Sequence, residues 1–461
     1  MQDAAVLTVA IAFELGLFAA VIFAVFGIDD LAVDALALAG FGRSNEAPVD
    51  DDAAITLRFA IFIPAWREAD VIGPMLDWLV QQWGARDYRV FVGVYSNDLA
   101  TMLAASDAAR RDPRIRLVIN DEPGPTTKGG CLNRLWRALG DGSPWRADAV
   151  LIHDAEDVVD AGELVLLARA LESADYAQIP VIPLLHPRSR WIGRHYCDEF
   201  AEAHGKDLPV RAAIGAPLPT AGVGCAFRVA ALVRIADADG PFAAGSLTED
   251  YELGLRLAAA GATGRFVAAR SIDGRRIASR AYFPNELPAA VRQKTRWMRG
   301  IALDGWDRLG WICSANAPPR QRLIDWWMLW RDRRGALAAI AIFASYAGLV
   351  LGLLGIAMAA LSEAALPPLG AAARWLVALN LAMLGWRLAR RGWFTAQVYG
   401  WRHGLFAMLR QPVSSIILVM TTWRAILSYM RSRGCAPAWD ATAHIFPASA
   451  VVAARTSLPL R

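Results

Sequence analysis

The chain has 461 residues, of which 55% are hydrophobic and 20% charged, and its formal net charge is +4 at pH 7. A charge this small for the length gives no reason to expect a nucleic-acid partner, and the five scattered cysteines, with no pair at metal-ligand spacing, argue against a disulfide framework. The hydrophobic residues concentrate at the N-terminus and in the last third, so membrane segments are expected to flank a soluble middle region.

The first expected element is an apolar helix in residues 1–30. The run from Ala4 to Ile28 is interrupted only by Glu14, and it exceeds the roughly 20 residues that cross a bilayer. A cleaved signal peptide would have a basic start and a shorter apolar core, which this run lacks. We therefore expect a retained transmembrane helix, followed by a partly acidic linker in residues 31–54.

Residues 55–310 alternate short β-rich runs with helical patterns. The expected strands are 57–63, 88–95, 115–119 and 149–153, and the expected helices are 71–83, 98–111 and 128–139. This alternation predicts an α/β domain with a mostly parallel sheet. Ligands of such sheets bind beyond the carboxyl ends of the strands, where polar residues fall here, at 64–68, 96–98, 120–121 and 154–157.

An acidic cluster follows the fourth expected strand. Asp154 and Glu156, at alternate positions with Asp157 beside them, can point to one side of the chain. Their oxygens suit Mg or Mn, which would bridge a diphosphate. The alternative is an acidic cap for a helix beginning near Asp160.

The segment around Ser246 is expected to begin another helix. Ser246 and Glu249 have the spacing of a capping box, which would give Glu249 a structural role. Asp250 has no such explanation, and a carboxylate in the first helical turn can act as a general base toward an attacking hydroxyl.

Two further segments could contact an anionic ligand. Lys128 opens a helix after a Pro-rich loop, where free N–H groups favour phosphate. Gln293, Arg296 and Trp297 share one face of a helix expected from about Asn285. That face suits a stacked sugar and a phosphate held by guanidinium, and the alternative is a membrane-proximal basic helix with an interfacial tryptophan.

A transmembrane hairpin is expected within residues 311–392. Its spans are Ala336–Leu361 and Ala371–Ala389. Arginines gather at the outer ends of the hairpin, before the first span and at the end of the second, whereas the connection 362–370 carries no positive charge. Those ends should therefore lie in the cytoplasm, together with the soluble region. The stretch 413–430 contains Arg424, which is costly in lipid. Residues 393–434 are thus expected to form interfacial helices, with a fourth span as the alternative, before a tail in residues 435–461.

In this order the segments resemble the processive family 2 glycosyltransferases, the group that includes cellulose synthase. The resemblance covers roughly 57–306, and its motifs are Pro64-x-x-x-Glu68, Lys128-x-x-x-Leu-Asn133, Asp154-x-Glu156, Thr248-Glu249-Asp250 and Gln293-x-x-Arg296-Trp297. It implies a GT-A-type glycosyltransferase domain with transmembrane and interfacial helices.

The resemblance also implies a role for each matching residue. Pro64, Glu68 and Asp98 would contact the nucleoside, Lys128, Asn133 and Glu249 would contact the substrate, and Asp250 would be the catalytic base. Asp154 and Glu156 would bind the metal and the diphosphate, with Asp157 as an alternative ligand. Gln293, Arg296 and Trp297 would hold the pyrophosphate and the acceptor end.

Two segments resemble more narrowly the phage-adsorption protein B (NfrB) group of bacterial inner-membrane glycosyltransferases. They are His153-Asp-Ala-Glu-Asp-Val-Val and Trp439-Asp-x-Thr-x-His444-x-Phe-Pro447. The cytosolic regulatory domain of that group is not expected after Pro447. The resemblance implies inverting transfer from a nucleotide-sugar donor, a UDP-hexose or UDP-N-acetylhexosamine, to a growing glycan of a surface polysaccharide. It also implies membrane lipids and an outer-membrane export or receptor partner. The alternatives are transfer of one sugar to a polyprenyl phosphate, or an inactive export scaffold.

Overall fold

A computed structural model describes residues 2–140, 144–314, 316–366, 368–431 and 444–447. Of the predicted tail in residues 435–461, all but 444–447 lies outside these ranges, including Trp439 of the motif that resembles the phage-adsorption group.

The centre of the α/β domain is a seven-stranded sheet in the order β3-β2-β1-β4-β6-β5-β7. Its strands are β1 (Phe59–Pro64), β2 (Tyr88–Val94), β3 (Ile115–Ile119), β4 (Ala149–Ile152), β5 (Tyr176–Gln178), β6 (Cys225–Arg228) and β7 (Gly264–Phe266). The first four are mutually parallel, and only β6 runs antiparallel to its neighbours β4 and β5. The predicted mostly parallel sheet is confirmed.

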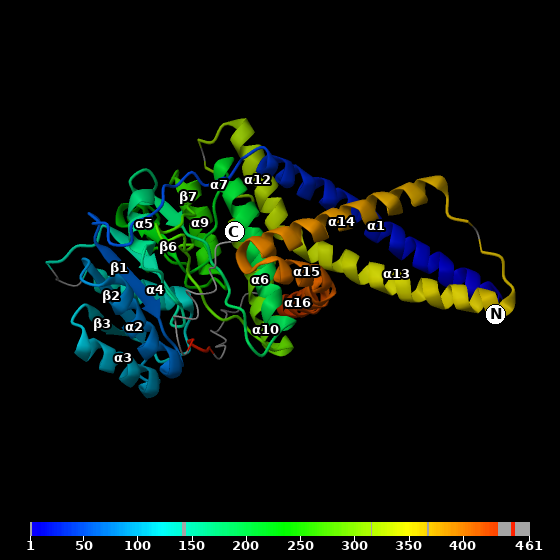
Figure 1. Ribbon diagram of the computed structural model, residues 1–461. Coiled ribbons are helices and arrows are strands. Elements are labelled where there is room, and N and C mark those ends of the chain that lie inside the picture. The colour runs from blue at the N-terminus through cyan, green and yellow to red at the C-terminus, as the bar shows by residue number, and fades with distance from the viewer. Residues whose placement is uncertain (1, 141–143, 315, 367, 432–443, 448–461) are drawn as a thin grey trace.

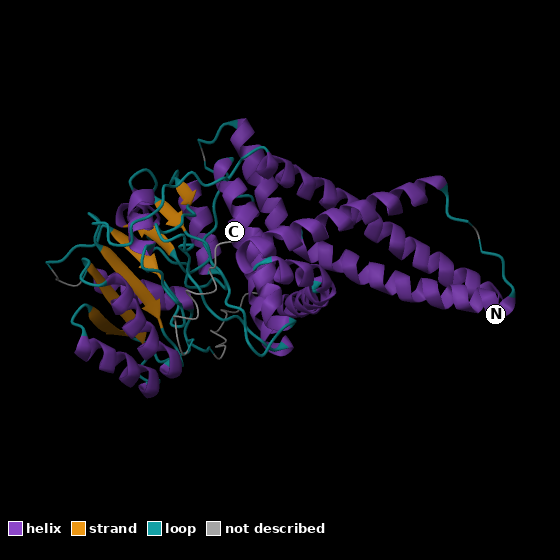
Figure 2. Cartoon of the chain, in the orientation of Figure 1, coloured by secondary structure: helices purple, strands orange, loops and turns teal. Residues whose placement is uncertain are grey.

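Helices cover both faces of this sheet, as Figure 2 shows. Side chains of α2 (Ala69–Trp83), α3 (Leu99–Arg111) and α5 (Glu163–Leu171) pack on one face with Phe59, Ile61 and Ile63 of β1. On the other face α4 (Lys128–Leu139), α8 (Val229–Ile235) and α9 (Glu249–Ala259) pack with Ala60 and Phe62. All six residues of β1 are therefore buried, as its continuous apolar run predicts.

Further helices link this domain to the membrane segments. They are α6 (Ile192–Glu202), the π-helix η1 (Ala203–Asp207), α7 (Leu208–Ala213), α10 (Leu287–Met298), the π-helix η2 (Arg299–Leu303), α11 (Asp304–Leu309) and α12 (Pro319–Arg333). They lie between the sheet and a long helical stalk in Figure 1.

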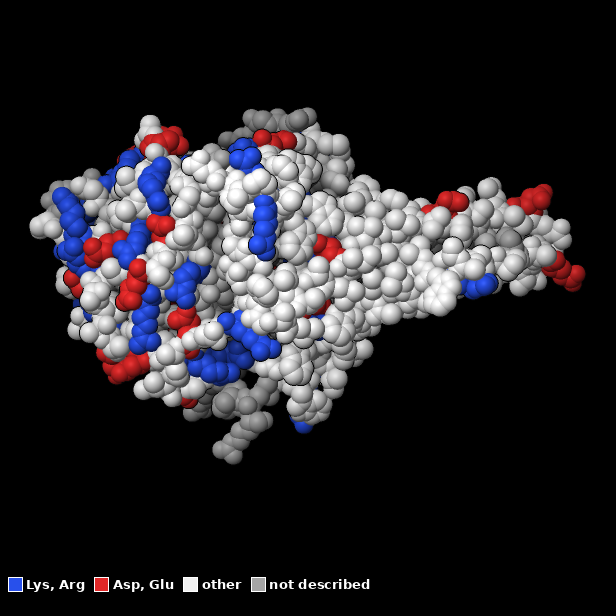
Figure 3. Space-filling view, turned by 90° about the horizontal axis from the view of Figure 1, so that it is seen from above, with Lys and Arg blue, Asp and Glu red and all other residues white. Residues whose placement is uncertain are grey.

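The stalk consists of α1 (Gln2–Leu38), α13 (Gly335–Ser362) and α14 (Ala371–Tyr399). Gln2 donates a hydrogen bond to the carbonyl of Ser362, 2.8 Å away, so the start of α1 lies beside the end of α13 at the tip of the stalk. Charged side chains are sparse along the stalk and dense on the catalytic domain in Figure 3. Such a surface is typical of a segment that lies in lipid.

Three helices among the described residues are long and apolar enough to cross a membrane: α1, α13 and α16 (Gln411–Arg431). The predicted spans 4–28 and 336–361 fall in the first two. The predicted span 371–389 falls in α14, which is not among the three because Arg374, Asn380 and Arg387 lower its hydropathy.

The helix α16 follows the short α15 (Trp401–Leu409) and packs against α10 and α13. Its composition allows a crossing. In Figure 1, however, it is viewed almost along its axis, whereas α1 and α13 run across the picture. It therefore does not run parallel to these helices.

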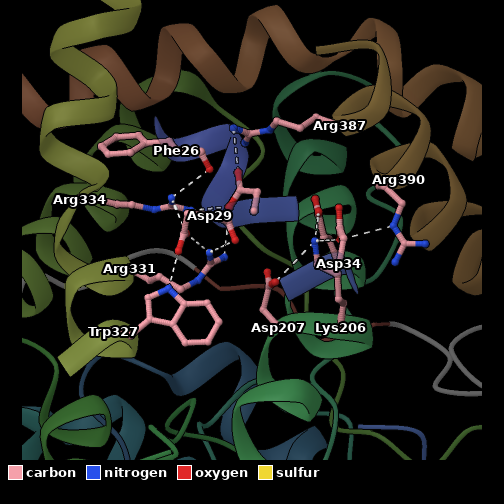
Figure 4. A network of polar contacts seen from close by, with 12 residues as sticks. Phe26, Asp29, Asp34, Lys206, Asp207, Trp327, Arg331, Arg334, Arg387 and Arg390 are labelled. Carbon is pink, nitrogen blue, oxygen red and sulfur yellow. Dashed lines mark hydrogen bonds and ion pairs between the residues drawn. The ribbon is translucent and has the colours of Figure 1, made fainter. Parts of the chain in front are cut away.

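A charge network joins the base of the stalk to the α/β domain (Figure 4). Asp29 and Asp30 of α1 pair with arginines from the α12–α13 junction and from α14, for example Arg334 with Asp29 at 2.7 Å. The carboxylate of Asp34 forms an ion pair with the ammonium of Lys206 in η1, 2.9 Å away. Buried pairs such as these fix orientation more than they stabilise, so the network holds the stalk in one position relative to the sheet.

Candidate active site

A cavity of about 180 Å³ opens at the carboxyl end of the parallel strands. It brings together eleven of the thirteen predicted site residues, namely Pro64, Glu68, Lys128, Asp154, Glu156, Asp157, Glu249, Asp250, Gln293, Arg296 and Trp297. The acids after β4, the first turn of α9 and the polar face of α10 therefore share one cavity, in the place expected for an α/β sheet.

Lys128 is the cation at the centre of this cavity. Its ammonium lies 2.6 Å from Asp154 and 3.8 Å from Glu249. Burial alone would lower the pKa of Lys128, but the surrounding carboxylates raise it above its ordinary value, so the side chain stays charged. It occupies the start of α4, where helical N–H groups also favour an anion.

Glu156 belongs to a second cluster, with Glu68 and His444. The ring of His444 lies 2.8 Å from Glu68 and 3.4 Å from Glu156, and ligand atoms of all three lie within 4.8 Å of one another. Burial raises the pKa of Glu156 to about 8, against the lowering effect of His444. The sequence analysis names His444 only as part of a motif. Its wide separation in sequence from Glu68 and Glu156 gave no reason to place it in this cluster.

Asp157 lines the same cavity but does not belong to this cluster. Its carboxylate accepts the backbone N–H of Asp154 at 3.0 Å and contacts His153 at 2.8 Å. His153 is fully buried and also lies 2.9 Å from Glu163 of α5. Asp157 thus holds the loop in shape, whereas Glu156 belongs with Glu68 and His444 to a group that could hold a metal ion, and Asp154 pairs with Lys128.

The alternative that these acids cap a helix does not hold. The helix α5 begins at Glu163, and its N-cap is Gly162. Asp154 and Glu156 are therefore several residues upstream of the helix start and point into the cavity instead.

Asp250 lies in the first turn of α9, opposite Lys128. Its Oδ1 accepts the N–H of Tyr251 at 2.8 Å, and burial raises the pKa of Asp250, partly offset by Lys128. Gly222 permits this position, because a Cβ there would lie 2.7 Å from Oδ2 of Asp250 and the backbone has φ +75°. A glycine at position 222 is thus required by the carboxylate that it faces.

The predicted capping box before α9 is wrong. The N-cap is Thr248, and Ser246 instead accepts the N–H of Thr248 at 3.2 Å and contacts Arg308. Glu249 therefore has no capping role. It lines the cavity, and burial raises its pKa to about 7.

The polar face of α10 forms another wall of the cavity. Gln293 has a buried carbonyl oxygen without a hydrogen-bond partner among the described residues, which leaves an acceptor for a ligand hydroxyl. Trp297 packs edge-on against Tyr196 at 6.1 Å and beside Phe283 at 6.4 Å, which fixes its ring. Gly300 lets the next turn approach Thr248, where a Cβ would come within 2.4 Å of its hydroxyl.

Two predicted residues do not line the cavity. Asp98 caps α3, with its carboxylate accepting from the N–H groups of Thr101 and Arg67. Asn133 is buried and exchanges two hydrogen bonds with the backbone of Phe242, at 2.7 and 3.0 Å. Asp98 therefore supports the loop that carries Glu68, and Asn133 ties α4 to the loop before α9.

The donor set fits a hard divalent cation. Asp154, Glu156 and Glu68 offer carboxylate oxygens, the ligands that Mg²⁺ and Mn²⁺ prefer, and His444 offers a ring nitrogen that Mn²⁺ also accepts. Lys128 and Arg296 bring positive charge to the same cavity. Such an arrangement can hold a diphosphate between cations with an acid, Asp250, placed to accept a proton.

Comparison with known proteins agrees with this geometry. Residues 57–300 match the model of the glycosyltransferase like family 2. Bacteriophage adsorption protein B of Escherichia coli (strain K12) and bacteriophage N4 adsorption protein B of Escherichia coli O157:H7 are each 34% identical over 415 residues, 84% of this chain. The chain spans 55% of the length of these curated relatives.

Among solved structures, the mannosyltransferase PcManGT from Pyrobaculum calidifontis in complex with GDP-Man and Mn²⁺ superposes with a TM-score of 0.53. The match is 17% identical and covers 91% of this chain and 99% of that chain. It shows that the two proteins share the GT-A fold. With its sheet, its cavity and the match over 57–300, this chain belongs to the family 2 glycosyltransferases.

Proposed function

We propose that the protein is a membrane-bound inverting glycosyltransferase of the bacterial inner membrane, which uses a nucleotide diphosphate-sugar to extend an exported or surface polysaccharide. The observation that supports this most is the meeting of Asp154, Asp250 and Arg296 in one cavity. The donor we propose is a UDP-hexose or UDP-N-acetylhexosamine, and an outer-membrane export partner would receive the product.

Asp250 is the proposed base. It removes the proton from the acceptor hydroxyl, whose oxygen attacks the anomeric carbon while the bond from that carbon to the diphosphate breaks. Lys128 and Arg296 stabilise the departing diphosphate, on which negative charge grows. Asp154 and Glu156 would hold Mg²⁺ or Mn²⁺, which would neutralise part of the same charge.

The face of α10 is the proposed acceptor platform. Trp297 presents a ring held by neighbouring aromatic side chains, and Gln293 presents a carbonyl oxygen that no described residue pairs with. A sugar stacked on the ring could donate a hydroxyl to this oxygen, so the acceptor end would be oriented toward Asp250.

The test is the Asp250→Asn variant of the full-length protein. With labelled nucleotide sugars and Mn²⁺, we expect sugar transfer to fall by about 10²–10⁴-fold, the usual contribution of a general base, while binding of the donor nucleotide is retained. The matched control is Asp239→Asn at an exposed position, which should transfer normally. Full activity of Asp250→Asn, or no transfer by the unsubstituted protein from any nucleotide sugar, would refute the proposal.

A further inference from the structure

A second and larger cavity, of about 680 Å³, lies where the stalk meets the catalytic domain. It is bounded by residues 37–48, at the end of α1 and after it, by 200–206 of α6 and η1, by 268–277, and by 390–399 of α14. At this level Leu38, Phe41 and Trp393 are 57%, 44% and 58% exposed. This juxtamembrane cavity therefore combines a lining from the catalytic domain with apolar side chains at the cytoplasmic end of the stalk.

Three arginines of the juxtamembrane cavity lack an acidic partner. The cavity also contains Lys206 and Glu46, but these pair with Asp34 at 2.9 Å and with Arg265 at 2.6 Å. Arg390 also lines the cavity, and it lies 3.5 Å from Asp34. No carboxylate of the described residues lies within ion-pair distance of the three remaining cations, Arg43, Arg270 and Arg276. The cavity thus carries uncompensated positive charge.

Arg276 is the most enclosed of the three. Its guanidinium donates to the carbonyl of Gln397 of α14 at 2.9 Å, and Arg270 forms a bridge with it through the backbone. Burial and the neighbouring Arg270 and Arg280 lower the pKa of Arg276. The electrostatic repulsion between such neighbouring guanidinium groups falls when an anion binds between them.

His204 adds a buried donor to the same cavity. Its Nδ1 accepts the N–H of Val181 at 3.2 Å, and burial lowers its pKa to about 3. The ring is therefore neutral and carries its proton on Nε2. The side chain is only 8% exposed, and Nε2 has no hydrogen-bond partner among the residues that the structure describes. His204 lines the cavity, and an N–H at a cavity wall without a partner among the described residues is a position for a ligand oxygen.

We propose that the juxtamembrane cavity binds the phosphate group of a membrane lipid. Arg43, Arg270, Arg276 and the Nε2–H of His204 hold the phosphate oxygens, and the hydrocarbon chain leaves past Leu38, Phe41 and Trp393 toward the bilayer. A neutral glycan would leave the three arginines unpaired, so the charge favours a phosphate. This proposal requires the membrane location given above but does not require sugar transfer.

The two cavities share a wall. Val181 and Phe200 line both of them, and Phe200 stacks on His204 on one side and lies 6.2 Å from Trp297 on the other. A lipid phosphate bound behind this wall would therefore lie close to the acceptor platform of α10.

The test uses the full-length protein in nanodiscs of phosphatidylcholine without any sugar donor. The probes are phosphatidic acid and a polyprenyl phosphate, each with a fluorescent tail. We expect Arg276→Gln to weaken binding of at least one probe by about tenfold, equivalent to about 1.4 kcal/mol. The matched control Arg402→Gln removes an exposed arginine of α15 that stacks on Trp401 outside the cavity and should bind within about twofold of the unsubstituted protein.

The outcomes separate the possible sources of the phosphate. Equal binding of both probes indicates any phospholipid headgroup, and tighter binding of the polyprenyl phosphate indicates a lipid-linked substrate. An equal loss in Arg402→Gln, unchanged binding in Arg276→Gln, or displacement of both probes by inorganic phosphate at similar concentration would overturn the proposal. Recovery of binding in Arg276→Lys, which keeps the charge, separates the site from a folding defect. Because no donor is present, failure here is distinct from failure of the proposed transfer reaction.

Discussion

The surroundings of Asp250 have two opposite effects on its pKa. Desolvation in the half-buried cavity, together with the nearby Asp154, raises the pKa of Asp250, and Lys128 limits that rise. Only the ionised carboxylate can accept the acceptor proton. Because the pKa of Asp250 is raised, the acid limb of kcat/KM should lie above the ordinary aspartate value of about 3.9.

This pH dependence can be measured with saturating Mn²⁺ between pH 4 and 9. We expect kcat/KM to rise with pH through the pKa of Asp250 and then to level off. The residual activity of Asp250→Asn should lack this limb. If that variant keeps the same limb, another group controls the profile.

Gly222 offers a second test at the scale of one residue. Gly222→Ala would place a methyl group 2.7 Å from Asp250 and 3.2 Å from Lys128, at a φ of +75°. We expect transfer to fall at least about tenfold because both side chains must move. Gly245→Ala, at a glycine with open space around its Cβ position, is the control and should stay active. Normal kinetics of Gly222→Ala would show that Asp250 tolerates displacement.

At the scale of elements, α6 joins the catalytic domain to α14 and α15. Asp198 of α6 is fully buried and binds Arg410 through contacts of 2.6 and 2.7 Å, with Arg391 3.7 Å away. Asp198→Ala would leave two arginines without their carboxylate. The expected loss of stability is about 3–5 kcal/mol, the usual cost of breaking a buried pair.

Thermal unfolding in detergent measures this loss. The control is Asp107→Ala, which breaks an exposed pair with Arg110 and should cost at most about 1 kcal/mol. If both variants unfold at the same temperature, α6 does not depend on Asp198 for its attachment to the membrane helices.

The strands and the helices between them were predictable because each short apolar run is buried in a parallel sheet. The predicted 115–119 and 128–139 match β3 and α4 to the residue. The capping box failed because tertiary contacts with Arg308 engage Ser246, and local spacing carries no information on them. His444 was missed as a site residue for the same reason, since it meets Glu68 only across the folded chain.

At the scale of the whole molecule, the stalk gives a topology that can be tested. Gln2 and Glu363 both lie at its tip, far from the catalytic domain in Figure 1. We expect Gln2→Cys and Glu363→Cys to react with a membrane-impermeant maleimide from the periplasmic side. Asp107→Cys, on α3 of the catalytic domain, should react only after the inner membrane is broken.

The unsubstituted chain is the control for the native cysteines, of which Cys131, Cys197 and Cys225 are buried. Labelling of Gln2→Cys and Glu363→Cys from opposite sides would contradict the arrangement of α1 and α13 as neighbours that cross together.

The contact between His444 and the pair Glu68 and Glu156 has a practical consequence. Residues 444–447 follow the last membrane-associated helix in sequence, yet His444 lines the catalytic cavity and Phe446 packs against the core beside Trp78. A soluble fragment that ends before α13 would therefore lack His444 and part of the cavity lining. If such a fragment were inactive, the cause would be the missing side chain of His444 and not the removal from the membrane.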